Sequence, residues 1–535
     1  MMTISKIPGG SLFNAISIEV LLALVLLAML VTMDIGVGAS ASKESTVPCT
    51  TCRMNVEDAC EPFAANDSAA FEEAMARVLS ITPEGSPYAS NFSNLSWSQA
   101  FREANLKMKE QYAFTDWREV DWDGLYSTFA PAIDEAERKG DKAQYYRTLK
   151  RYVGSIHDGH VNVKGPNYGS LRADIGGGYG FAVCRLSSGK IAVCYVAKGS
   201  QAQMAGISPG DRLLEWNGMP AEEALNETSY IWSPFMPSTQ EGIILQKARF
   251  MTRSTEGNEA TAKVQGKDGE IRDVKLKAYY DSYETLTKST YFLGKAFNDT
   301  ALTENSMAVL ESLPEGGVVY SILPEGYGYV FAYIEMPQGY GLFRDAIESF
   351  VRADVPGVIV DLRFNDGGDD SIAACMSSFF LKDKSLFERV SNYNANTGKL
   401  DTIASIWSKP QNLIYSGPVA VLVSPYTIST GEGLPMMIKR KPLGKVISFY
   451  GTAGAFGIEI GSISMPLGIT LRYPTGRSLD AEGRIQIDSN SSLVGGVPPD
   501  IRIPITEDVI TRFTEGKDVQ LEAAMQWLKE QRGKE

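Results

Sequence analysis

Two histidines stand close together in the segment SIHDGHVNV, residues 155–163, and they are the only histidines among 535 residues. An imidazole with a pKa of about 6.5 can accept a proton near neutral pH and return it, which is general acid–base chemistry. His157 and His160 are separated by Asp-Gly and follow a helical pattern directly, and the glycine is typical of a loop. We therefore expect an active-site loop here rather than two metal ligands on one helix.

A second candidate lies in VAVLVSPYTISTGEG, residues 419–433, which predicts a buried strand, a turn and a helix. A serine on such a turn is held with its hydroxyl outward and with neighbouring N–H groups facing the same way, as a nucleophile requires. The same position also suits a helix cap, so the residue types alone leave both roles open for Ser429 and Thr430. The pattern is not G-x-S-x-G, which disfavours an α/β-hydrolase turn.

A third candidate is VIVDLRFNDGGDD, residues 358–370, where an apolar strand runs into Gly367 and Gly368. Two glycines allow unusual backbone angles and leave N–H groups exposed beside a helix N-terminus, where an anion or an oxyanion is stabilised. Tight strand-to-helix turns also use glycine for steric reasons. On this segment alone, an anion site and a plain turn both remain open.

Helical segments must position the histidines. Residues 96–155 carry aromatic and aliphatic residues at three-and-four spacing in three successive stretches, with charged residues between them. The pattern predicts three helices that pack as an N-terminal helical bundle over 96–165. The last of them ends just before His160, so the bundle would deliver this residue at its C-terminal end.

The next segment, 170–282, alternates short β-type runs with turns. The stretch GYGF at 178–181, followed by SQAQMAGISPGDRLLEWNG at 200–218, resembles a PDZ domain. In that family the backbone amides of the glycine-rich loop bind a peptide's C-terminal carboxylate. The resemblance implies substrate binding at Tyr179, Gly180 and Phe181; the alternative is a β domain that uses these glycines for turns.

The largest segment, 315–507, alternates strands and helices, which predicts βαβ units around a mostly buried sheet. The chain closes with an amphipathic pattern, LEAAMQWLKEQ, which predicts a C-terminal helix within 508–535. The fold class expected from all these segments is multidomain α/β.

The first 41 residues are typical of a targeting segment, with Lys6, an apolar run at 20–33 and the small residues Ala-Ser-Ala at 39–41. The apolar run is shorter than the roughly 20 residues that span a bilayer, so we expect a cleaved signal peptide rather than a membrane anchor. Either reading places the rest of the chain outside the cytoplasm: secreted, periplasmic or membrane-anchored and facing outward. Residues 42–95 are predicted to form a linker.

Composition narrows the class of partner. Hydrophobic residues make up 44% of the chain, so it is globular, and a net charge of −13 without blocks of one sign excludes nucleic acid as an expected partner. Cys49, Cys52 and Cys60 lack a fourth metal ligand nearby, so disulfides or free thiols are expected. Cys184 and Cys194 flank a predicted hairpin, on which they would lie close enough to form a structural disulfide.

The order of the motifs YIEM, DLRFNDGG, VAVLVSPYTISTGEG and GGVPPDIRI, after a PDZ-like segment, resembles the C-terminal processing peptidases, also called tail-specific proteases, and their tricorn-like relatives. The similarity covers roughly 160–505. It implies a crotonase-like (ClpP/crotonase-type) α/β catalytic core and no metal or cofactor. In this family the nucleophile lies three residues before a glutamate, here Glu432, which assigns it to Ser429. Thr430 would supply one oxyanion N–H, and Gly367 or Gly368 the other.

One departure from the family bears on the general base. Bacterial processing peptidases use a lysine about 25 residues beyond the serine, but that stretch here is YGTAGAFG, residues 450–457. Three lysines lie one predicted helix along instead: Lys439, Lys441 and Lys445. The tricorn-like branch uses a histidine in a segment similar to DGHV, which matches His160. His157 is then expected to cap the helix end or to pack there, favoured by the helix dipole.

The residue that orients the imidazole is less defined. In the tricorn-like branch it is an acidic residue near the end of the domain, in a stretch that here offers Asp480, Glu482 and Asp488. We favour Asp488 and keep the other two open. Glu432 is expected to brace its turn rather than move protons, and Asp366 to shape the glycine loop.

The resemblance thus predicts an extracytoplasmic serine endopeptidase of the tail-specific type, with an acyl-enzyme on Ser429 and His160 as general base. Its substrates would be polypeptides, engaged in part through their C-termini, and both a membrane tether and a homo-oligomer are compatible with it. The alternative is a non-catalytic peptide- or lipophile-binding protein on the same scaffold, as retinoid-binding relatives illustrate. A fluorophosphonate probe would separate the two functions.

Overall fold

The computed structural model describes residues 88–290, 293 and 316–532, which belong to one compact unit. The expected targeting segment at 1–41, nearly all of the linker at 42–95, and the three cysteines Cys49, Cys52 and Cys60 lie outside the described residues. Within those ranges, no helix combines the length and the apolar character needed to cross a bilayer.

Three helices follow one another where the spacing predicts them: α4 (Trp97–Gln111), α5 (Trp122–Lys139) and α6 (Lys142–Gly154). Each begins after a polar residue whose side chain accepts a hydrogen bond from a backbone N–H of the first turn. Such an N–H has no acceptor within the helix itself, so the cap supplies the missing partner. These caps are Ser96, Asp121 and Asp141. The helices therefore start and stop at positions set by local sequence.

The helices share their core with a sheet rather than packing only on one another. Phe101 of α4 contacts the rings of Tyr126 and Tyr152, and the same cluster includes Leu471 and Tyr473 from a strand far along the chain. A shared apolar core fixes the end of α6 against that strand. The segment that follows α6 carries His160.

That sheet has six strands in the order β1-β19-β20-β15-β16, with β2 also paired to β20. Strands from segments far apart in the sequence form this sheet, and local sequence patterns did not predict it. β2 begins two residues after His160 and runs antiparallel to β20, with Asn162 opposite Arg472. The bounds are β1 (Ala89–Asn91), β2 (Asn162–Lys164), β15 (Ser385–Asn394), β16 (Lys399–Ser408), β19 (Ile458–Met465) and β20 (Ile469–Leu479).

The segment predicted to be a β domain holds an antiparallel sheet in the order β10-β9-β6-β5-β4. Two of its strands, β9 and β10, alternate buried residues with more exposed ones, as half-buried strands do. The bounds are β4 (Phe181–Arg185), β5 (Ile191–Val196), β6 (Arg212–Trp216), β9 (Glu259–Gln265) and β10 (Ile271–Lys277). Helix α10 (Gln240–Met251) packs on β4.

Shorter elements complete this region: α7 (Ser170–Ile175), β3 (Gly177–Gly178), α8 (Gln201–Met204), β7 (Met219–Pro220), α9 (Ala221–Glu227), β8 (Arg253–Ser254), β11 (Tyr279–Tyr280) and α11 (Glu284–Lys288). The expected disulfide between Cys184 and Cys194 is absent, and both residues are buried free thiols. Cys184 lies opposite Ala192, and a bulge at Ala182 and Val183 shifts the pairing beyond it. The two cysteines are therefore not directly opposite.

The third large sheet has the order β12-β13-β14-β17-β18-β21, in which every pair except β12 with β13 is parallel. This confirms the expected βαβ arrangement, and the fully buried valines and leucines of β14 and β17 are typical of a parallel sheet. The strands are β12 (Val318–Ile322), β13 (Gly328–Ala332), β14 (Val358–Asp361), β17 (Val419–Leu422), β18 (Gly444–Ser448) and β21 (Ile501–Arg502).

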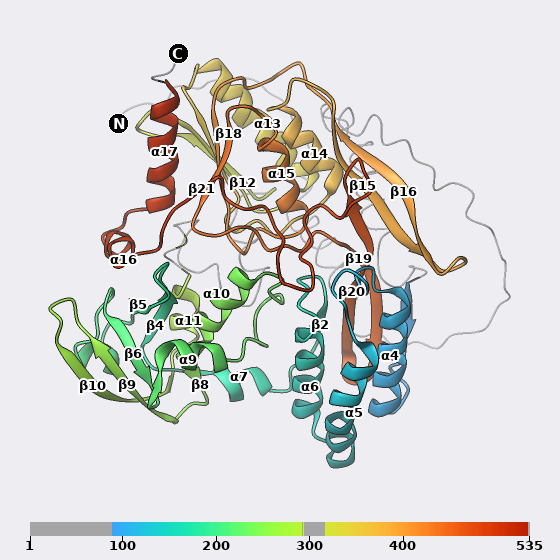
Figure 1. The fold of residues 1–535 in the computed structure, drawn as a ribbon, viewed down its shortest axis with the longest axis vertical. Helices are drawn as coiled ribbons and strands as arrows, with labels where there is room; N and C mark the ends of the chain where they lie inside the picture. Colours follow the sequence, from blue (N-terminus) through green and yellow to red (C-terminus); the bar gives the residue numbers. More distant parts are fainter. Residues whose placement is uncertain (1–87, 291–292, 294–315, 533–535) are drawn as a thin grey trace, which may run out of the picture. The chain divides into compact units, whose positions relative to one another are not determined.

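Helices α13 (Pro337–Arg352), α14 (Asp370–Ser378) and α15 (Thr430–Ile438) connect these strands, and a short turn of helix, η3 (Pro466–Gly468), links β19 to β20 (Figure 1). The C-terminal segment forms two helices rather than the single one expected, α16 (Glu507–Thr514) and α17 (Val519–Arg532). Helix α17 packs on β17 and β18, where Leu528 fills the space beside Gly357.

Three neighbouring parallel strands end at the same edge of this sheet: β14, β17 and β18. The segment after β14 contains Gly367, the segment after β17 contains Ser429, and the segment after β18 contains Ala455. Loops at the carboxyl ends of adjacent parallel strands lie together. In open α/β sheets, ligand-binding sites form at this edge. The fold thus brings the two glycine- and serine-containing candidates side by side.

Candidate active site

Ser429 occupies a strained turn between β17 and α15. Its φ of 58° and ψ of −140° are unusual for a residue other than glycine, and strain of this kind clusters at functional sites. Its backbone N–H donates to the carbonyl oxygen of Ala455 at 2.9 Å. Its side chain makes no capping bond to the helix and is partly exposed, so the hydroxyl is not used as the helix cap that the sequence left open.

The glycine loop meets this turn directly. Gly367 and Gly368 have φ values of 88° and 152°, which only glycine adopts readily. Gly367 donates its N–H to Oδ1 of Asn365 at 2.9 Å, so that amide is already used. Among the described residues, the N–H groups of Gly368 and Thr430 donate to no partner. Of the predicted oxyanion donors, Gly368 and Thr430 are the two that remain available.

Asn365 joins the glycine loop to the serine turn, and sequence reasoning missed it. Its side-chain amide donates to the carbonyl of Ala332 at 3.0 Å and to Oε1 of Glu335 at 2.7 Å. Its own carbonyl accepts the N–H of Ile428, the residue before the serine, at 3.1 Å. The only signal in the sequence was an amide residue directly after a buried strand.

Glu335 is a second missed residue, located after β13. Its side chain is 1% exposed, and burial raises its pKa to about 8. Within the described part of the chain, Oε2 of Glu335 has no hydrogen-bond partner. Its backbone also pairs with the glycine loop, accepting from Asp369 and donating to Gly367, each at 2.9 Å.

Glu432 braces the serine turn, as predicted. Its carboxylate accepts the backbone N–H groups of Gly454 and Ala455, each at 2.8 Å, and the hydroxyl of Thr452. Burial raises its pKa to about 8, against the opposing effect of these donors. The contacts link the first turn of α15 to the loop that accepts the Ser429 N–H.

Thr430 is fixed by its own hydroxyl, which donates to Oδ1 of Asp370 at 2.6 Å and lies 3.0 Å from the carbonyl of Gly368. Burial raises the pKa of Asp370 to about 6, and the bond from Thr430 opposes this rise. The hydroxyl therefore holds the two free N–H groups in a fixed relation to each other.

His160 lies in the loop after α6 and is 7% exposed. Its backbone N–H donates to Oδ1 of Asp158 at 2.9 Å. In the described ranges, Nδ1 of its ring has no hydrogen-bond partner, and no hydrogen bond joins its ring to Ser429. The orientation of the ring is therefore not fixed by a hydrogen bond at Nδ1.

The histidine loop and the serine turn are nevertheless in contact through their neighbouring residues. A methyl group at Gly159 would lie 2.7 Å from Cδ1 of Ile428 and 3.0 Å from Cβ of Ala455. Gly159 precedes His160, and Ile428 precedes Ser429. Segments almost 270 positions apart thus meet at van der Waals distance, which the absence of a side chain on Gly159 permits.

Asp488 lies beside the same loop. Its Oδ1 accepts the N–H of Phe456 at 2.9 Å, and its buried Oδ2 has no hydrogen-bond partner among the residues described. Burial raises its pKa to about 6, while the charges of Arg118 and His160 lower it. The other two acidic candidates lie in an exposed turn, where Asp480 and Glu482 both pair with Arg484. Asp488 remains the predicted partner of the imidazole.

His157 packs beyond the end of α6, which is one of its two predicted roles, but the expected effect of the helix dipole is not found. It lies beyond the end of α6, with a φ of 54°, and Nδ1 of its ring is 3.2 Å from the hydroxyl of Tyr230. Burial, and then the charges of Arg118 and Lys247, lower its pKa. The charged form that a helix dipole would favour is therefore disfavoured, because the neighbouring charges are positive.

Arg118 contacts the histidine loop at two residues, and no pattern in the sequence marks it. It donates to the carbonyl of His157 at 2.6 Å and to the hydroxyl of Ser489 at 2.9 Å. Its guanidinium also forms ion pairs with Asp158 at 3.5 Å and with Asp488 at 3.8 Å. The hydroxyl of Tyr112 donates to Asp158 at 2.6 Å.

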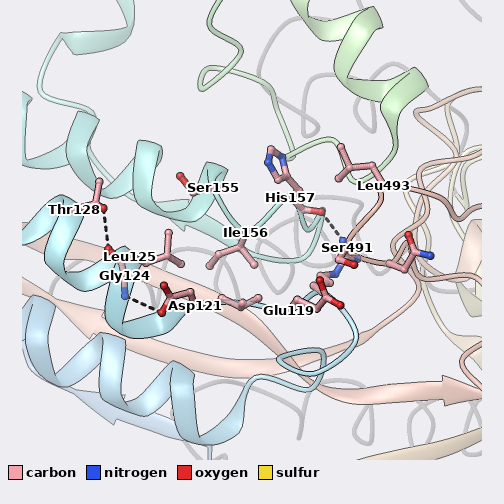
Figure 2. Close-up of a pocket in the computed structure, with 13 residues that line it drawn as sticks. Glu119, Asp121, Gly124, Leu125, Thr128, Ser155, Ile156, His157, Ser491 and Leu493 are labelled. Atoms are coloured by element: carbon pink, nitrogen blue, oxygen red, sulfur yellow. Dashed lines mark hydrogen bonds between the residues drawn. The ribbon is translucent and has the colours of Figure 1, made fainter.

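A cavity of about 330 Å³ is lined by Arg118 and by residues at the start of α5 and the end of α6. Figure 2 shows His157, Ile156 and Ser155 on one wall and Ser491 and Leu493 on another. Neither Ser429 nor His160 lines it. The cavity is therefore separate from the candidate active site, although Arg118 belongs to both.

The residues of the PDZ-like loop pack inside their own domain. The side chains of Tyr179 and Phe181 are 3% and 0% exposed, and both rings contact Trp216. Gly180 has a φ of 82°, and its carbonyl accepts the N–H of Ala197. Only backbone groups of this loop could meet a ligand, so substrate binding there remains a prediction.

The remaining predicted residues have other partners. Lys439 contacts Pro498 and Asp500, and Lys441 donates to the carbonyls of Tyr415 and Ser416. Lys445 lies in β18. Asp366 is exposed in the glycine loop, and its backbone N–H donates to the carbonyl of Tyr333.

In the residues that the structure describes, no three histidine, cysteine, aspartate or glutamate side chains are grouped so as to hold a metal ion.

Comparison with protein families matches two parts of the chain. Residues 330–503 match the model of peptidase family S41, and residues 93–144 match the model of the tricorn protease C1 domain. The first match contains Ser429, Gly368 and Asp488, and the second contains Arg118. No curated protein matches the chain.

Among solved structures, mature CPAF complexed with lactacystin has a TM-score of 0.55 and 14% sequence identity, covering 81% of this chain and 99% of that one. The photosystem II D1 C-terminal processing protease has a TM-score of 0.37 and 15% identity, covering 76% and 93%. The tricorn protease has a TM-score of 0.34 and 16% identity, covering 82% of this chain and 37% of the other. The likeness to CPAF shows a shared fold.

Proposed function

We propose that the chain, whose residues 330–503 match the model of peptidase family S41, is a serine endopeptidase of the tail-specific type with Ser429 as nucleophile and His160 as general base. The observation that carries the proposal is the conformation of Ser429. The residue is held at a φ of 58° with a hydroxyl that caps no helix, beside the unused N–H groups of Gly368 and Thr430.

The chemistry follows from these positions. Ser429 Oγ attacks the scissile carbonyl while His160 accepts its proton, and the developing oxyanion accepts the N–H groups of Gly368 and Thr430. His160 then returns the proton to the leaving amine, which releases the C-terminal product. Water hydrolyses the acyl-enzyme by the same proton transfers in reverse, and Ser429 is regenerated. No cofactor takes part in these steps.

Asp488 completes the proposed site. Its unpartnered Oδ2 and the unpartnered Nδ1 of His160 are both buried, and their charges interact. A carboxylate that accepts the Nδ1–H bond stabilises the imidazolium formed during the reaction. We propose that this bond, and the bond between the His160 ring and Ser429, close when substrate binds, because catalytic hydrogen bonds tighten in the substrate complex.

The finer description of the molecule is also part of the proposal. The parallel sheet with α13, α14 and α15 would be the crotonase-like core, residues 170–282 a PDZ-like domain, and α4, α5 and α6 an N-terminal helical bundle. The composition of residues 1–41 supports an extracytoplasmic location. The substrates would be polypeptides, with backbone groups near Gly180 available to bind a C-terminus.

A fluorophosphonate probe tests the proposal on the full chain. The wild-type protein is expected to be labelled, and labelling is expected to disappear in Ser429→Ala and in His160→Ala. Two matched controls should keep their labelling: Ser492→Ala, an exposed serine, and His157→Asn, since asparagine tolerates the positive φ at that position.

The other outcomes are equally informative. If the wild-type protein is not labelled, the chain is a non-catalytic binding protein on this scaffold, and the proposal is wrong. If His160→Ala keeps its labelling, another group removes the proton from Ser429, and the role given to His160 is wrong. Mass spectrometry of the labelled peptide identifies the residue modified.

A further inference from the structure

Arg118 is a buried cation that connects three separate loops. Its guanidinium is 3% exposed, and it contacts the histidine loop at the carbonyl of His157, the loop after β18 at the carbonyl of Gly454, and the segment after Asp488 at the hydroxyl of Ser489. The distances are 2.6, 3.5 and 2.9 Å respectively. Figure 2 shows the bond at the His157 carbonyl as a dashed line.

The same guanidinium lies between two buried carboxylates. Asp158 is in the histidine loop and fixes the backbone of His160, whereas Asp488 fixes the backbone of Phe456. Both side chains are 0% exposed, so neither charge is screened by water. A single cation that pairs with both carboxylates holds the histidine loop against the acidic residue proposed to orient the ring.

The pairing is incomplete in one respect. Within the described residues, Oδ2 of Asp488 and Nδ1 of His160 have no hydrogen-bond partner, although both are buried. Buried polar atoms without partners are uncommon and need a physical explanation. Arg118 stabilises the ionised form of Asp488, which leaves this oxygen free to accept a bond from the ring.

We propose that Arg118 is a positioning residue of the peptidase site, which holds the His157–His160 loop in place and keeps Asp488 ionised so that it can orient His160. The inference rests on the proposed function, because it concerns the same reaction. Among the described residues, no hydrogen bond or ion pair joins Arg118 to Ser429 or to the His160 ring, so it acts through the loop and through Asp488.

Several charged groups act on Asp488, and they decide the direction of the expected effects. Burial has the largest effect on its pKa and raises it; Arg118 and His160 lower the pKa, and Asp158 raises it. Three further groups interact with its charge from neighbouring elements: Glu432, Glu388 and Tyr112. Loss of Arg118 therefore raises the pKa of Asp488, and loss of the charge of Asp158 lowers it.

The test is the pH dependence of the rate at which a fluorophosphonate labels Ser429. In Arg118→Gln, the acidic limb of the profile is expected to move to higher pH by about one unit, since an opposite charge within a few ångströms shifts a carboxyl pKa by that amount or more.

Asp158→Asn is the matched variant and should move the limb in the opposite direction. Its carbonyl oxygen can still accept the N–H of His160, and its NH2 group can donate to the hydroxyl of Tyr112, so these two loop contacts are kept and only the ion pair with Arg118 is lost. Loss of a negative charge beside Asp488 lowers the pKa of that residue, and the acidic limb moves to lower pH. If the acidic limb moves in opposite directions in Arg118→Gln and Asp158→Asn, a loss of packing cannot be the cause, because it would not depend on the sign of the charge removed.

Chemical rescue covers the case in which removal of the arginine disturbs folding. The cavity of about 330 Å³ is lined by Arg118, so in Arg118→Ala a guanidinium ion can enter and occupy the vacated space. We expect guanidinium at millimolar concentration to restore the labelling rate, and tetramethylammonium, which donates no hydrogen bonds, to have no effect. The folded state of each variant is monitored by circular dichroism.

The outcomes separate this inference from the proposed function. If wild-type protein is labelled but Arg118→Gln has an unshifted profile with only a lower plateau, Arg118 is a structural residue and the inference is wrong. If the folded Arg118→Ala variant gains nothing from guanidinium, the inference is also wrong. If wild-type protein is not labelled at all, the peptidase proposal itself fails first.

Discussion

A methyl group placed on Gly367 would lie 2.6 Å from Cβ of Ser429 and 3.2 Å from its Oγ, closer than side chains approach in folded proteins. The glycine loop and the serine turn are therefore packed without space for one additional carbon atom. This contact and the φ of 88°, and not hydrogen bonding to the oxyanion, explain why the position requires glycine.

Gly367→Ala is expected to displace Ser429 and to reduce its labelling by a fluorophosphonate by at least about 100-fold, since small misplacements of a reacting group have effects of that size. Gly398→Ala is the control, because Gly398 also has a positive φ, 65°, but no atom lies within 4 Å of the added carbon. The control should lose about 1 kcal/mol of stability and keep its labelling rate. Equal loss of labelling in both variants would show that backbone strain alone is responsible.

Gly159→Ala is expected to push the histidine loop away from the serine turn, because the new methyl group would lie 2.7 Å from Cδ1 of Ile428. We expect labelling to slow on the order of 10-fold. The double variant Gly159→Ala/Ile428→Val removes the conflicting atom and should recover most of the rate. Ile428→Val alone, measured in parallel, should cost about 1 kcal/mol of stability and have little effect on labelling. A double variant no faster than Gly159→Ala would contradict the contact.

Thr430→Val removes the hydroxyl that joins Asp370 to the carbonyl of Gly368. The loss of one buried hydrogen bond, about 1.4 kcal/mol, corresponds to a decrease of about 10-fold in labelling rate. Thr430→Ser keeps the hydroxyl and should retain nearly the full rate. Similar rates for the valine and serine variants would show that the hydroxyl does not hold the oxyanion donors.

Stability should fall as pH rises, because of Glu335. Its pKa is raised from 4.5 to about 8 in the folded protein, so between these values the folded state holds a proton that the unfolded state releases. The free energy of unfolding should therefore decrease through this window, by up to about 1.4 kcal/mol per pH unit for this group. Urea unfolding at pH 5 and pH 8 measures the difference.

Glu335→Gln cannot ionise and should reduce that difference, while its side-chain oxygen can still accept the bond from Asn365. Glu432, whose pKa is also raised to about 8, should leave part of the dependence in place. Glu223→Gln serves as the control at an exposed glutamate and should leave the difference unchanged. A wild-type protein equally stable at both pH values would contradict the sign of the effect.

Local patterns in the sequence predicted the elements that carry the site. The spacing of apolar residues placed α4, α5 and α6 within a few residues of their observed bounds, and the apolar runs predicted β14 and β17. The strand-to-helix turn at Ser429 and the glycine loop at Gly367 followed from the same patterns. These features depend on residues close together in the chain, which is why periodicity reveals them.

Contacts between distant segments could not be predicted in this way. Arg118 pairs with Asp488, 370 positions later, and no local property of the segment TDWREVDW marks its arginine. β1 pairs with β19 and β2 with β20 for reasons that arise only when the whole sheet forms. The expected disulfide failed for a related reason, because the register between β4 and β5 places Cys184 opposite Ala192 rather than Cys194.

The distance along the chain between Arg118 and Asp488 has a consequence for synthesis. A growing polypeptide folds from its N-terminus as it leaves the ribosome, so the helices and the histidine exist long before the acidic residue that is meant to pair with them. Until Phe456, Asp488 and Ser489 have emerged, the nascent chain lacks the last components of the site. The proposed site is therefore expected to be complete, and the protein active, only after these last segments have been synthesised.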